Sequence, residues 1–503
     1  MTNRRQKLAV SISRTTLLLV VIVASSQMDV AADADQRPNI VLCMADDQGW
    51  GDVGYYGKSI AITPVLDEMA ASALRLDRFY AAAPVCSPTR GSVLTGRHPN
   101  RFACFSWGHS LRPEEITIAE VLAAAGYATG HFGKWHLGSV NSNSDVCPGA
   151  SGFDQWFSSP NFYENDPLMS HNGRVVQTKG EGSEVTMKAA IDFIRASSQE
   201  KKPFFAVVWF GSPHNPHVAL DADRQLYADQ PAKLQHYYGE ITAMDRSIGT
   251  LRKELRKLDI AGNTLVWYTS DNGPQGPLSR KQPGSAGGLR DRKGTLWEGG
   301  IRVPTIIEWP TRISAPRISS VPGNTVDIFP TLLDIAGIDA VNQPQPIDGL
   351  SILPLIDGKM TDRAKPMGFW SFPARGQGMA SRKMLAAQLA AQRSGEPLPP
   401  PPNNASQRKV RADAALEVLA KPGLVGHAAW IDNQYKLHRI PTSDPSSAKY
   451  TLYNLAVDTA EANDLARKMP DRVARMRADL NRWQQSVVRS IAGDDYLSQR
   501  SSP

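Results

Sequence analysis

The sequence has no uninterrupted hydrophobic run long enough to form a stable membrane-spanning helix, and its longest apolar run covers only residues 17–24. It also lacks a Lys- and Arg-rich stretch with interleaved aromatic residues, the pattern typical of nucleic-acid-binding proteins. Cysteine is scarce, with four residues in a chain of 503. These absences argue against a nucleic-acid partner and against stable membrane insertion, and they leave few thiols to account for.

The N-terminal segment has the layout of a cleaved secretory signal. Basic residues precede the short apolar run and small residues follow it, namely Arg4, Arg5, Lys7 and Arg14 before it and Ala31 and Ala32 after it. We therefore predict that residues 1–32 are a signal peptide, with an uncleaved membrane anchor as the alternative. The mature protein is expected to be exported to a periplasmic or extracellular location, or to a lysosomal-type compartment if the source is eukaryotic.

Length and composition indicate a globular protein with more than one part. A chain of 503 residues exceeds what one hydrophobic core usually serves, which predicts a large domain plus a smaller one. Hydrophobic residues make up 41% and charged residues 21%, as in ordinary globular domains. The formal net charge of +7 is compatible with a polyanionic substrate, but a surplus of this size is usually a solvated surface.

Three short apolar runs read as strands that are buried on both faces of a parallel sheet: residues 39–45, 204–210 and 264–269. The first ends at Asp46 and Asp47. Two adjacent carboxylates at the end of a core strand repel each other and lose hydration, so a cation beside them is a natural compensation. A helix cap with a solvated neighbour is the alternative that this pair alone leaves open.

The segment from Pro84 to Gly96 is the most informative stretch of the chain. Ser87 and Pro88 suit the N-cap and first turn of a helix, whose free N–H groups and positive dipole end favour an anion. Arg90 adds a fixed charge one turn further on. A lone Cys such as Cys86 is usually a small core residue, but its Ser, Pro and Arg neighbours argue against that interpretation here.

This segment resembles the sulfatase signature, in which a Cys is followed two residues later by Pro and four residues later by Arg. Residues 133–138 resemble the second sulfatase signature, with Phe132 standing where a smaller or β-branched residue is usual. Residues 287–304 resemble a further sulfatase segment that contains Lys293. The resemblance covers roughly residues 37–375 and 425–490. It implies that Cys86 is oxidised to formylglycine by a formylglycine-generating enzyme or an anaerobic sulfatase-maturing enzyme.

The resemblance also implies the fold. We expect an α/β protein with a large, doubly wound, mixed but mostly parallel sheet sandwiched by helices, as in alkaline phosphatase, and a smaller C-terminal antiparallel sheet plus helix. The catalytic domain is predicted at residues 37–365 and the smaller domain at 366–495. An exposed insertion is predicted at about 376–424, where a Pro-dense run occurs. Residues 154–170 are predicted to be a long loop near the mouth of the cleft.

The resemblance assigns a metal site to the ends of two strands. Asp271 and Asn272 would complete an oxygen cage with Asp46 and Asp47, and the oxidised Cys86 would be a further metal ligand. Asp-Asn-Gly by itself is nearly always a turn, so the assignment depends on the other signatures. Because the ligands are all oxygen atoms, a hard cation is expected and zinc is disfavoured. One Ca²⁺ ion per chain is favoured over Mg²⁺ because several protein oxygens converge.

The same resemblance assigns catalytic roles. Arg90, Lys134 and Lys293 would stabilise the sulfate oxygens. His136 would contact a hydroxyl of the hydrated formylglycine, and His214 would protonate the departing alcohol. In isolation, Lys134 and His136 would each more often be an ordinary surface residue.

Two more residues in the same regions, His217 and Asp245, are given no firm catalytic role. His217 is left without a firm role. Asp245, within a predicted helix at 234–258, is interpreted as a structural hydrogen-bonding residue.

The predicted function is hydrolysis of a sulfate monoester, on a sulfated carbohydrate or an aryl sulfate, through a covalent formylglycine–sulfate intermediate. One alternative is a phosphate or phosphonate monoester hydrolase of the same superfamily. Another is an unmodified protein that only binds sulfated glycans, and a third is a metal-dependent phosphatase with unmodified Cys86, disfavoured because that position has no Ser or Thr. The sequence does not distinguish among sulfated substrates.

The remaining cysteines leave one structural question open. Cys43 lies inside a predicted buried strand. A Cys104–Cys147 disulfide and two free thiols are both compatible with the sequence.

Overall fold

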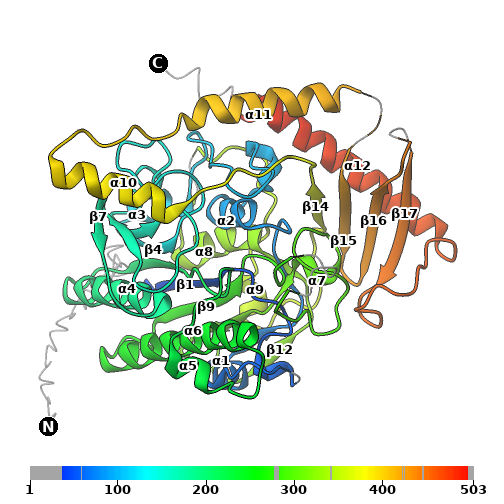
Figure 1. The fold of residues 1–503 in the computed structure, drawn as a ribbon. Coiled ribbons are helices and arrows are strands. Elements are labelled where there is room, and N and C mark those ends of the chain that lie inside the picture. Colours follow the sequence, from blue (N-terminus) through cyan, green and yellow to red (C-terminus); the bar gives the residue numbers. More distant parts are fainter. Residues whose placement is uncertain are drawn as a thin grey trace, which may run out of the picture. The chain divides into compact units, whose positions relative to one another are not determined.

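The structure is a computed structural model. A mixed sheet of ten strands forms the centre of the described part of the chain (Figure 1). The structure describes residues 37–57, 59–276, 282–339, 342–421, 423, 425–444 and 447–496, so the predicted signal segment lies outside the described residues. In spatial order the strands are β12 (Arg317–Ser319), β2 (Leu74–Leu76), β11 (Ile306–Glu308), β9 (Thr264–Ser270), β1 (Asn39–Ala45), β8 (Phe204–Trp209), β4 (Ala128–Lys134), β5 (Gln155–Ser159), β6 (Leu168–His171) and β7 (Arg174–Gln177).

The five central strands, β9, β1, β8, β4 and β5, run parallel to one another. Along β1, Val41 and Cys43 pack into the core on one face of the sheet, while Ile40 and Leu42 pack into the core on the other. A strand that is covered on both sides has no polar face, which is why β1 reads as a continuous apolar run. The predicted parallel, doubly covered sheet is confirmed.

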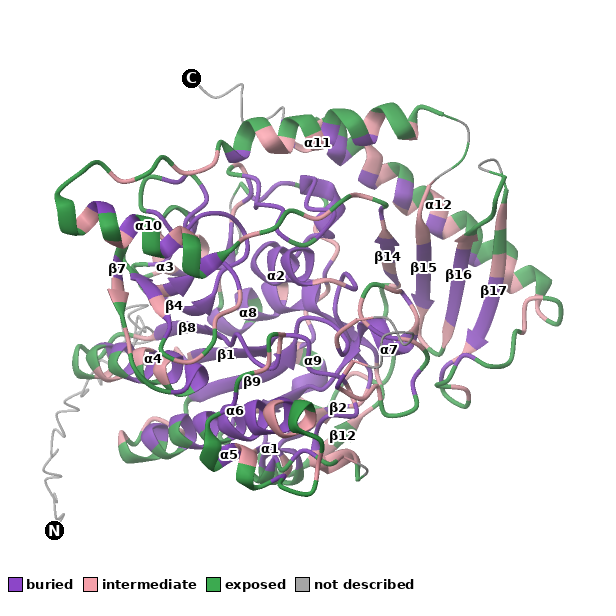
Figure 2. Ribbon diagram, in the orientation of Figure 1, coloured by how far each residue is buried: buried purple, intermediate pink, exposed green. Residues whose placement is uncertain are grey.

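Helices cover both faces of this sheet (Figure 1). One face is covered by α1 (Pro64–Ser72), α4 (Gly182–Gln199) and α6 (Ala232–Lys257), with the short α5 (Asp221–Gln225) packed on α6. The other face carries α2 (Cys86–Thr95), α3 (Ile118–Ala124), α8 (Ile328–Ala336) and α9 (Leu353–Ile356). Figure 2 shows the strands buried and the outer sides of α4, α5 and α6 exposed, as amphipathic covering helices require.

Asp245 has the structural role that the sequence indicated. One carboxylate oxygen accepts a hydrogen bond from the backbone N–H of Val65 at 3.0 Å, and the other accepts from Leu66 at 2.8 Å. These N–H groups belong to the first turn of α1, which has no partners for them within the helix. Asp245 therefore caps α1 from a neighbouring helix.

The C-terminal part contains a four-stranded antiparallel sheet, as predicted. Its strands are β14 (Met367–Ser371), β15 (His427–Asp432), β16 (Tyr435–Pro441) and β17 (Ala448–Asn454), and helix α12 (Pro470–Ala492) packs on it. The described residues from Arg37 onward pack as one compact unit. The predicted domain boundary near residue 365 therefore stays a prediction.

The insertion predicted at 376–424 is attached to the rest of the protein at defined points. It carries two helices, α10 (Ser381–Ser394) and α11 (Asn404–Leu419), and Leu385 of α10 is buried in the main core. The Gln392 side chain accepts a hydrogen bond from the Val175 N–H and donates one to the Val175 carbonyl. Gln392 thus pairs with the free edge of β7, which would otherwise expose unpaired backbone groups.

The prediction of one long loop at 154–170 is wrong. Residues Gln155–Ser159 form β5 beside β4, and Leu168–His171 form β6, so only residues 160–167 are irregular. Sequence periodicity missed β5 because the strand has only five residues and its burial does not alternate strictly: the side chains are exposed, buried, half-buried, buried and buried in order.

All four cysteines are free thiols, so Cys104 and Cys147 do not form a disulfide. Burial raises the pKa of Cys43 and of Cys104 to about 12, as expected for inert core thiols. No helix within the described ranges is both long and apolar enough to cross a membrane.

Candidate active site

Cys86 lies at the start of α2, at the edge of the sheet where the parallel strands end. Helix α2 begins at Cys86 itself, with extended Val85 before it, so the expected N-cap role of Ser87 is wrong. The Ser87 hydroxyl instead accepts a hydrogen bond from the Gly108 N–H at 2.8 Å. The first turn of a helix presents free N–H groups, so an anion beside residue 86 faces a favourable electrostatic environment.

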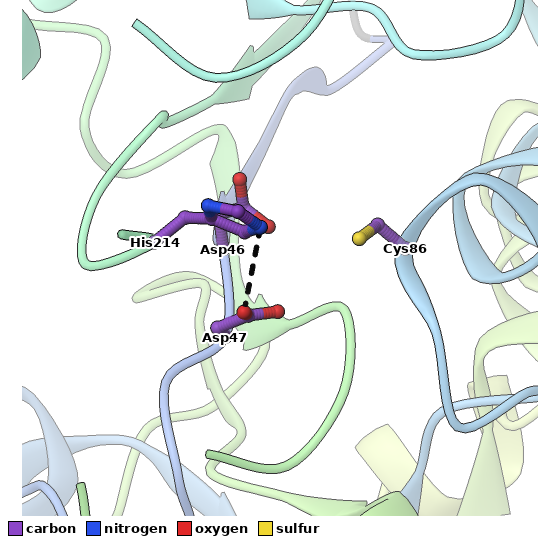
Figure 3. A group of neighbouring side chains, drawn as sticks. All are labelled: Asp46, Asp47, Cys86 and His214. Atoms are coloured by element: carbon purple, nitrogen blue, oxygen red, sulfur yellow. Dashed lines mark ion pairs between the residues drawn. The ribbon is translucent and has the colours of Figure 1, made fainter. Parts of the chain in front are cut away.

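The carboxylates that follow β1 lie next to this thiol. One potential ligand atom from each of Asp46, Asp47, Cys86 and His214 lies within 4.8 Å of the others. In Figure 3 the Cys86 sulfur points toward the two carboxylates, and His214 approaches Asp47 from the opposite side. The predicted meeting of residue 86 with the carboxylates of β1 is therefore confirmed.

Asp271 and Asn272, which follow β9, complete the group. The Asn272 side-chain N–H donates to Asp47 Oδ1 at 2.8 Å, and Asp271 Oδ1 accepts from the Asp47 N–H at 3.1 Å. This close pairing depends on Gly273, because a Cβ atom there would lie 1.9 Å from the Gly299 carbonyl oxygen. A glycine is required after Asn272 for the β9 loop to pass this close to α7 (Glu298–Ile301).

The residues fit a hard cation. Asp46 Oδ1 and Asn272 Oδ1 are both buried, and neither has a hydrogen-bond partner among the described residues. Burial raises the pKa of Asp46 to about 7, although Lys134 opposes this effect. Another positive charge is therefore needed to keep Asp46 ionised at neutral pH. The donor set is rich in oxygen, which is typical of Ca²⁺ or Mg²⁺ sites.

Arg90 and Lys134 support the carboxylates from behind. The Arg90 guanidinium donates to Asp271 Oδ2 at 2.7 and 3.1 Å and to the Lys134 carbonyl oxygen at 3.1 Å. Lys134 Nζ donates to Asp46 Oδ2 at 2.6 Å. Both side chains are fully buried, and neither lines the pocket beside Cys86. In the structure, these contacts hold in place the carboxylates that follow β9 and β1.

Lys293 is the cation that reaches the pocket. Its Nζ lies 2.5 and 2.7 Å from the two Asp47 oxygens and 3.5 Å from the Cys86 sulfur. Burial alone would lower the pKa of Lys293, but Asp47 and the nearby acidic groups hold that pKa above its ordinary value. Lys293 is therefore a fixed positive charge next to residue 86.

Two histidines face the same space. His136 is buried, and neither ring nitrogen has a hydrogen-bond partner in the described structure. Its φ of 54° is left-handed, which is uncommon for a residue other than glycine and is often found at functional sites. His214 Nδ1 lies 2.6 Å from the Asn215 carbonyl oxygen, and Nε2 lies 3.6 Å from Asp47 Oδ2. Burial lowers the pKa of both histidines, so each is neutral at pH 7.

The position of His136 depends on the backbone conformation at the end of β4. Gly133 has a φ of 99°, and a Cβ atom there would lie 1.9 Å from the Trp209 carbonyl oxygen. Only glycine allows β4 to run this close to β8 before the chain turns toward the site. The glycine of the second signature segment is thus explained by backbone packing.

A pocket of about 610 Å³ opens beside these groups. Of the predicted residues, Cys86, His136, His214 and Lys293 line it. The sequence missed its other walls, namely Trp107, Asn161, Phe162 and Gly378–Ala380. Phe162 stacks on the His214 ring at 4.4 Å between centroids.

Sequence signals for these walls were weak. Trp107 was detectable only as a single Trp in a turn-rich stretch, and nothing in the sequence marked Met379. The sequence placed residues 154–170 near the mouth of the cleft, which agrees with Asn161 and Phe162 in the pocket wall, but it singled out neither side chain.

His217 lies outside this pocket lining. Its Nδ1 lies 3.5 Å from Glu240 Oε2, and its ring meets the Tyr237 ring edge to face at 5.1 Å. These contacts indicate packing between the loop after β8 and α6.

Comparisons with known proteins agree with this geometry. A family model described as Sulfatase matches residues 38–338. The chain is 36% identical to N-acetylgalactosamine-6-sulfatase of Sus scrofa, over 69% of this chain and 71% of the relative. It is 31% identical to human arylsulfatase A, over 68% and 72%. A solved structure of Ps i-CgsB in complex with k-i-k-neocarrahexaose superposes with a TM-score of 0.73 at 24% identity, covering 89% of this chain and 93% of that one.

The fold and the site together define an ester hydrolase with an alkaline-phosphatase-like sheet, whose polar groups gather beyond the carboxyl ends of the parallel strands. The chain belongs to the sulfatase family and is a sulfuric ester hydrolase.

Proposed function

We propose that the protein removes sulfate from a sulfated carbohydrate, using residue 86 as a formylglycine nucleophile beside a bound Ca²⁺ ion. The observation that carries the proposal is that Lys293 lies within hydrogen-bonding range of both Cys86 and the buried Asp47, beside one pocket. The names of the sulfatase relatives support a sulfated sugar over other sulfate esters, since the first relatives act on a sulfated hexosamine by name.

The environment of Cys86 supports a requirement for oxidation. Burial is the largest effect on this thiol and raises its pKa, although Lys134 and Lys293 oppose the shift. A thiol with a raised pKa is rarely ionised at pH 7 and is a poor nucleophile. Oxidised to an aldehyde and hydrated, residue 86 would instead supply a hydroxyl nucleophile, together with a second hydroxyl whose deprotonation can expel sulfate.

Asp46, Asp47, Asp271 and Asn272 would hold the Ca²⁺ ion. When bound, the ion would supply positive charge that favours the ionised nucleophile and the sulfate oxygens. Lys293 would bind a sulfate oxygen, because its ammonium group is the fixed cation that lines the pocket. Arg90 and Lys134 would act mainly by fixing Asp271 and Asp46.

The two neutral histidines would move protons. His136 has no partner on either ring nitrogen, so it is free to accept a proton from a hydroxyl at residue 86. His214 keeps Nε2 toward the pocket because Nδ1 is engaged by the Asn215 carbonyl. Because Nδ1–H donates to that carbonyl, Nε2 of the neutral ring carries a lone pair. His214 would therefore protonate the departing sugar oxygen after Nε2 has taken up a proton, a charged form that the Asp47 carboxylate 3.6 Å away would stabilise.

This proposal implies a maturation partner and an exported location. A formylglycine-generating or anaerobic sulfatase-maturing enzyme must oxidise Cys86 before the residue is buried, since the thiol is only 1% exposed in the folded chain. We infer export from the signal-like pattern of residues 1–32.

The test compares a sulfated monosaccharide with its phosphate analogue and measures the mass of the peptide that contains residue 86. We expect faster turnover of the sulfate ester and a mass lower than that of the Cys peptide by about 18 Da, as thiol-to-aldehyde conversion requires. Faster turnover of the phosphate would favour the phosphate or phosphonate hydrolase. An unmodified Cys86 peptide in an active preparation would overturn the formylglycine mechanism, and binding without turnover would identify a glycan-binding protein.

A further inference from the structure

A second pocket adjoins the one beside Cys86. It has a volume of about 560 Å³, and Phe162, Met379 and Ala380 line both pockets. Each pocket lies within the size range that binds small organic ligands. One sulfated sugar in the first pocket would therefore border the second across Phe162, an aromatic surface on which a neighbouring sugar ring can pack.

Hydrogen bonds fix the residues that form the wall between the two pockets. The Asn161 N–H donates to the Ser381 hydroxyl at 2.9 Å, and the Asn161 side chain donates to the Met379 carbonyl at 3.2 Å. On the other side, the Gln377 N–H donates to the Trp107 carbonyl at 2.9 Å. The start of the 376–424 insertion is thus joined to two catalytic-domain loops, so both pockets keep a defined shape.

The second pocket contains polar groups without protein partners. Ser159 is fully buried, lines this pocket, and has a hydroxyl with no hydrogen-bond partner in the described structure. A buried hydroxyl left in this state costs free energy unless a ligand or water satisfies it. Asn161 Oδ1, in the wall of the first pocket, is likewise buried and unpartnered. Both observations point to a polar ligand that extends across the two pockets.

The rim of the second pocket is positively charged. Arg382 and Lys383, in the first turn of α10, both line it and are exposed, and neither forms an ion pair with any described residue. Glu164 is the single acidic residue of the lining, so the rim keeps a surplus of positive charge. A ligand group with a negative charge is favoured next to Arg382 and Lys383, while sugar hydroxyls can donate to Glu164.

We propose that the second pocket is a subsite for the sugar next to the one that loses its sulfate, and that Arg382 and Lys383 select an anionic group, sulfate or carboxylate, on that sugar. The inference rests on the proposed function and makes it more specific. The preferred substrate is an oligosaccharide with at least two charged groups, and the insertion, which lies outside the segments resembling the family, provides the selectivity.

The experiment compares two disaccharides that differ by one group: one has a single sulfate, and the other carries a second sulfate or a carboxylate on the neighbouring sugar. For the double variant Arg382→Ala/Lys383→Ala, we expect kcat/KM for the doubly charged substrate to fall about tenfold relative to the singly sulfated one, mainly through KM. Added salt should reduce the wild-type preference, because the contacts are exposed.

Arg393→Ala is the matched control, since Arg393 lies at the other end of α10 and lines neither pocket. It should leave the preference for the doubly charged substrate unchanged. Ser159→Ala should raise KM for both disaccharides while leaving that preference intact. An unchanged preference in the Arg382/Lys383 variant would overturn the subsite. Absence of wild-type turnover on both disaccharides and on a simple aryl sulfate would instead refute the proposed function.

Discussion

At residue 86, the proposed mechanism depends on an aldehyde oxygen that cysteine does not carry. We predict that Cys86→Ala abolishes turnover, because no hydroxyl remains to attack sulfur. Cys86→Ser should at best trap a sulfated enzyme, since a serine sulfate has no second hydroxyl to expel the sulfate. Mass spectrometry should then show one added SO₃ group on that peptide.

Cys147→Ser is the control for this experiment, because Cys147 is also a free thiol but does not line the pocket. Its activity should equal that of the wild type. Multiple turnover by Cys86→Ser would contradict the covalent mechanism.

His214 is predicted to act on the leaving group. His214→Ala should slow hydrolysis of a sugar sulfate by about 10² to 10⁴, because an alkoxide needs protonation as it departs. The same change should have a much smaller effect on 4-nitrophenyl sulfate, whose phenolate is a good leaving group. Steady-state kcat on the two substrates provides the measurement.

His217→Ala provides a matched comparison, because His217 contacts Glu240 and Tyr237 and lies outside the pocket lining. Any effect of that variant should be equal on both substrates. An equal loss on both substrates in His214→Ala would argue for a positioning role in place of acid catalysis.

Most site residues were predicted from the resemblance to sulfatase segments, and the position of several of them directly after strands explains why they converge. Asp46 and Asp271 come immediately after apolar runs, so their convergence follows from a parallel sheet. Trp107 and Met379 could not be placed in the same way. They meet only because the Gln377 backbone bonds to the Trp107 carbonyl, a tertiary contact that no local pattern encodes.

At the scale of elements, the ends of β1 and β9 bring several acidic oxygens together, and their repulsion must be offset. Removing the proposed Ca²⁺ ion with a chelator should abolish activity and destabilise the fold. Saturating ion at 100-fold above its dissociation constant would contribute about 2.7 kcal/mol to the free energy of unfolding. Thermal unfolding with and without added Ca²⁺, together with metal analysis of the untreated protein, measures this effect.

The ion should restore both activity and thermal stability, and Asp46→Asn should weaken both responses. A chelated protein with unchanged activity and unchanged unfolding temperature would contradict the metal site. Mg²⁺ serves as the comparison ion, because it prefers strict octahedral geometry and retains its waters.

Helix α1 allows a test in which stability should change and catalytic activity should not. Asp245→Asn should lower the free energy of unfolding by about 1–3 kcal/mol, because one of the two bonds to the first turn of α1 is lost and a buried N–H remains unpaired. Activity per folded molecule should not change, since Asp245 does not line the pocket. Urea unfolding and kcat/KM provide the two readouts.

Asp192→Asn on α4 is the control, because its pair with Lys188 is exposed and contributes at most about 0.5 kcal/mol. Equal destabilisation by the two variants would contradict the capping role of Asp245.

Elements were predictable from the sequence where they were long and periodic. They were less predictable where they were short or where their packing depends on segments that are distant in the sequence. Helix α6 was recognised from its apolar face, whereas β5 was not, because its neighbours in the sheet determine its strand conformation. The packing of helix α10 was missed as well. Composition marked the insertion as exposed, while Leu385 and Gln392 attach it to the core and to β7.

At the scale of the whole described unit, Asp348 joins the catalytic part to the C-terminal helix. Its carboxylate accepts hydrogen bonds from Arg101 at 2.6 and 2.9 Å, from the His98 N–H at 2.6 Å, and from the Trp483 indole of α12 at 2.9 Å. Burial alone would raise the pKa of Asp348, but Arg101 outweighs it and holds the pKa well below its ordinary value. The ionised form is therefore the one that stabilises the fold.

We predict that Asp348→Asn destabilises the protein by about 3–5 kcal/mol at pH 7, because Arg101 is left buried without its counter-charge. A lowered folded-state pKa gives stability that is present above the unfolded-state value of about 3.9 and is lost as the pH falls below it. The difference between variant and wild type should therefore shrink below about pH 4. Asp357→Asn, which breaks the more exposed pair with Arg312, should cost at most about 1 kcal/mol. Urea unfolding across this pH range checks both variants, and a pH-independent loss in Asp348→Asn would show that its charge does not hold these parts together.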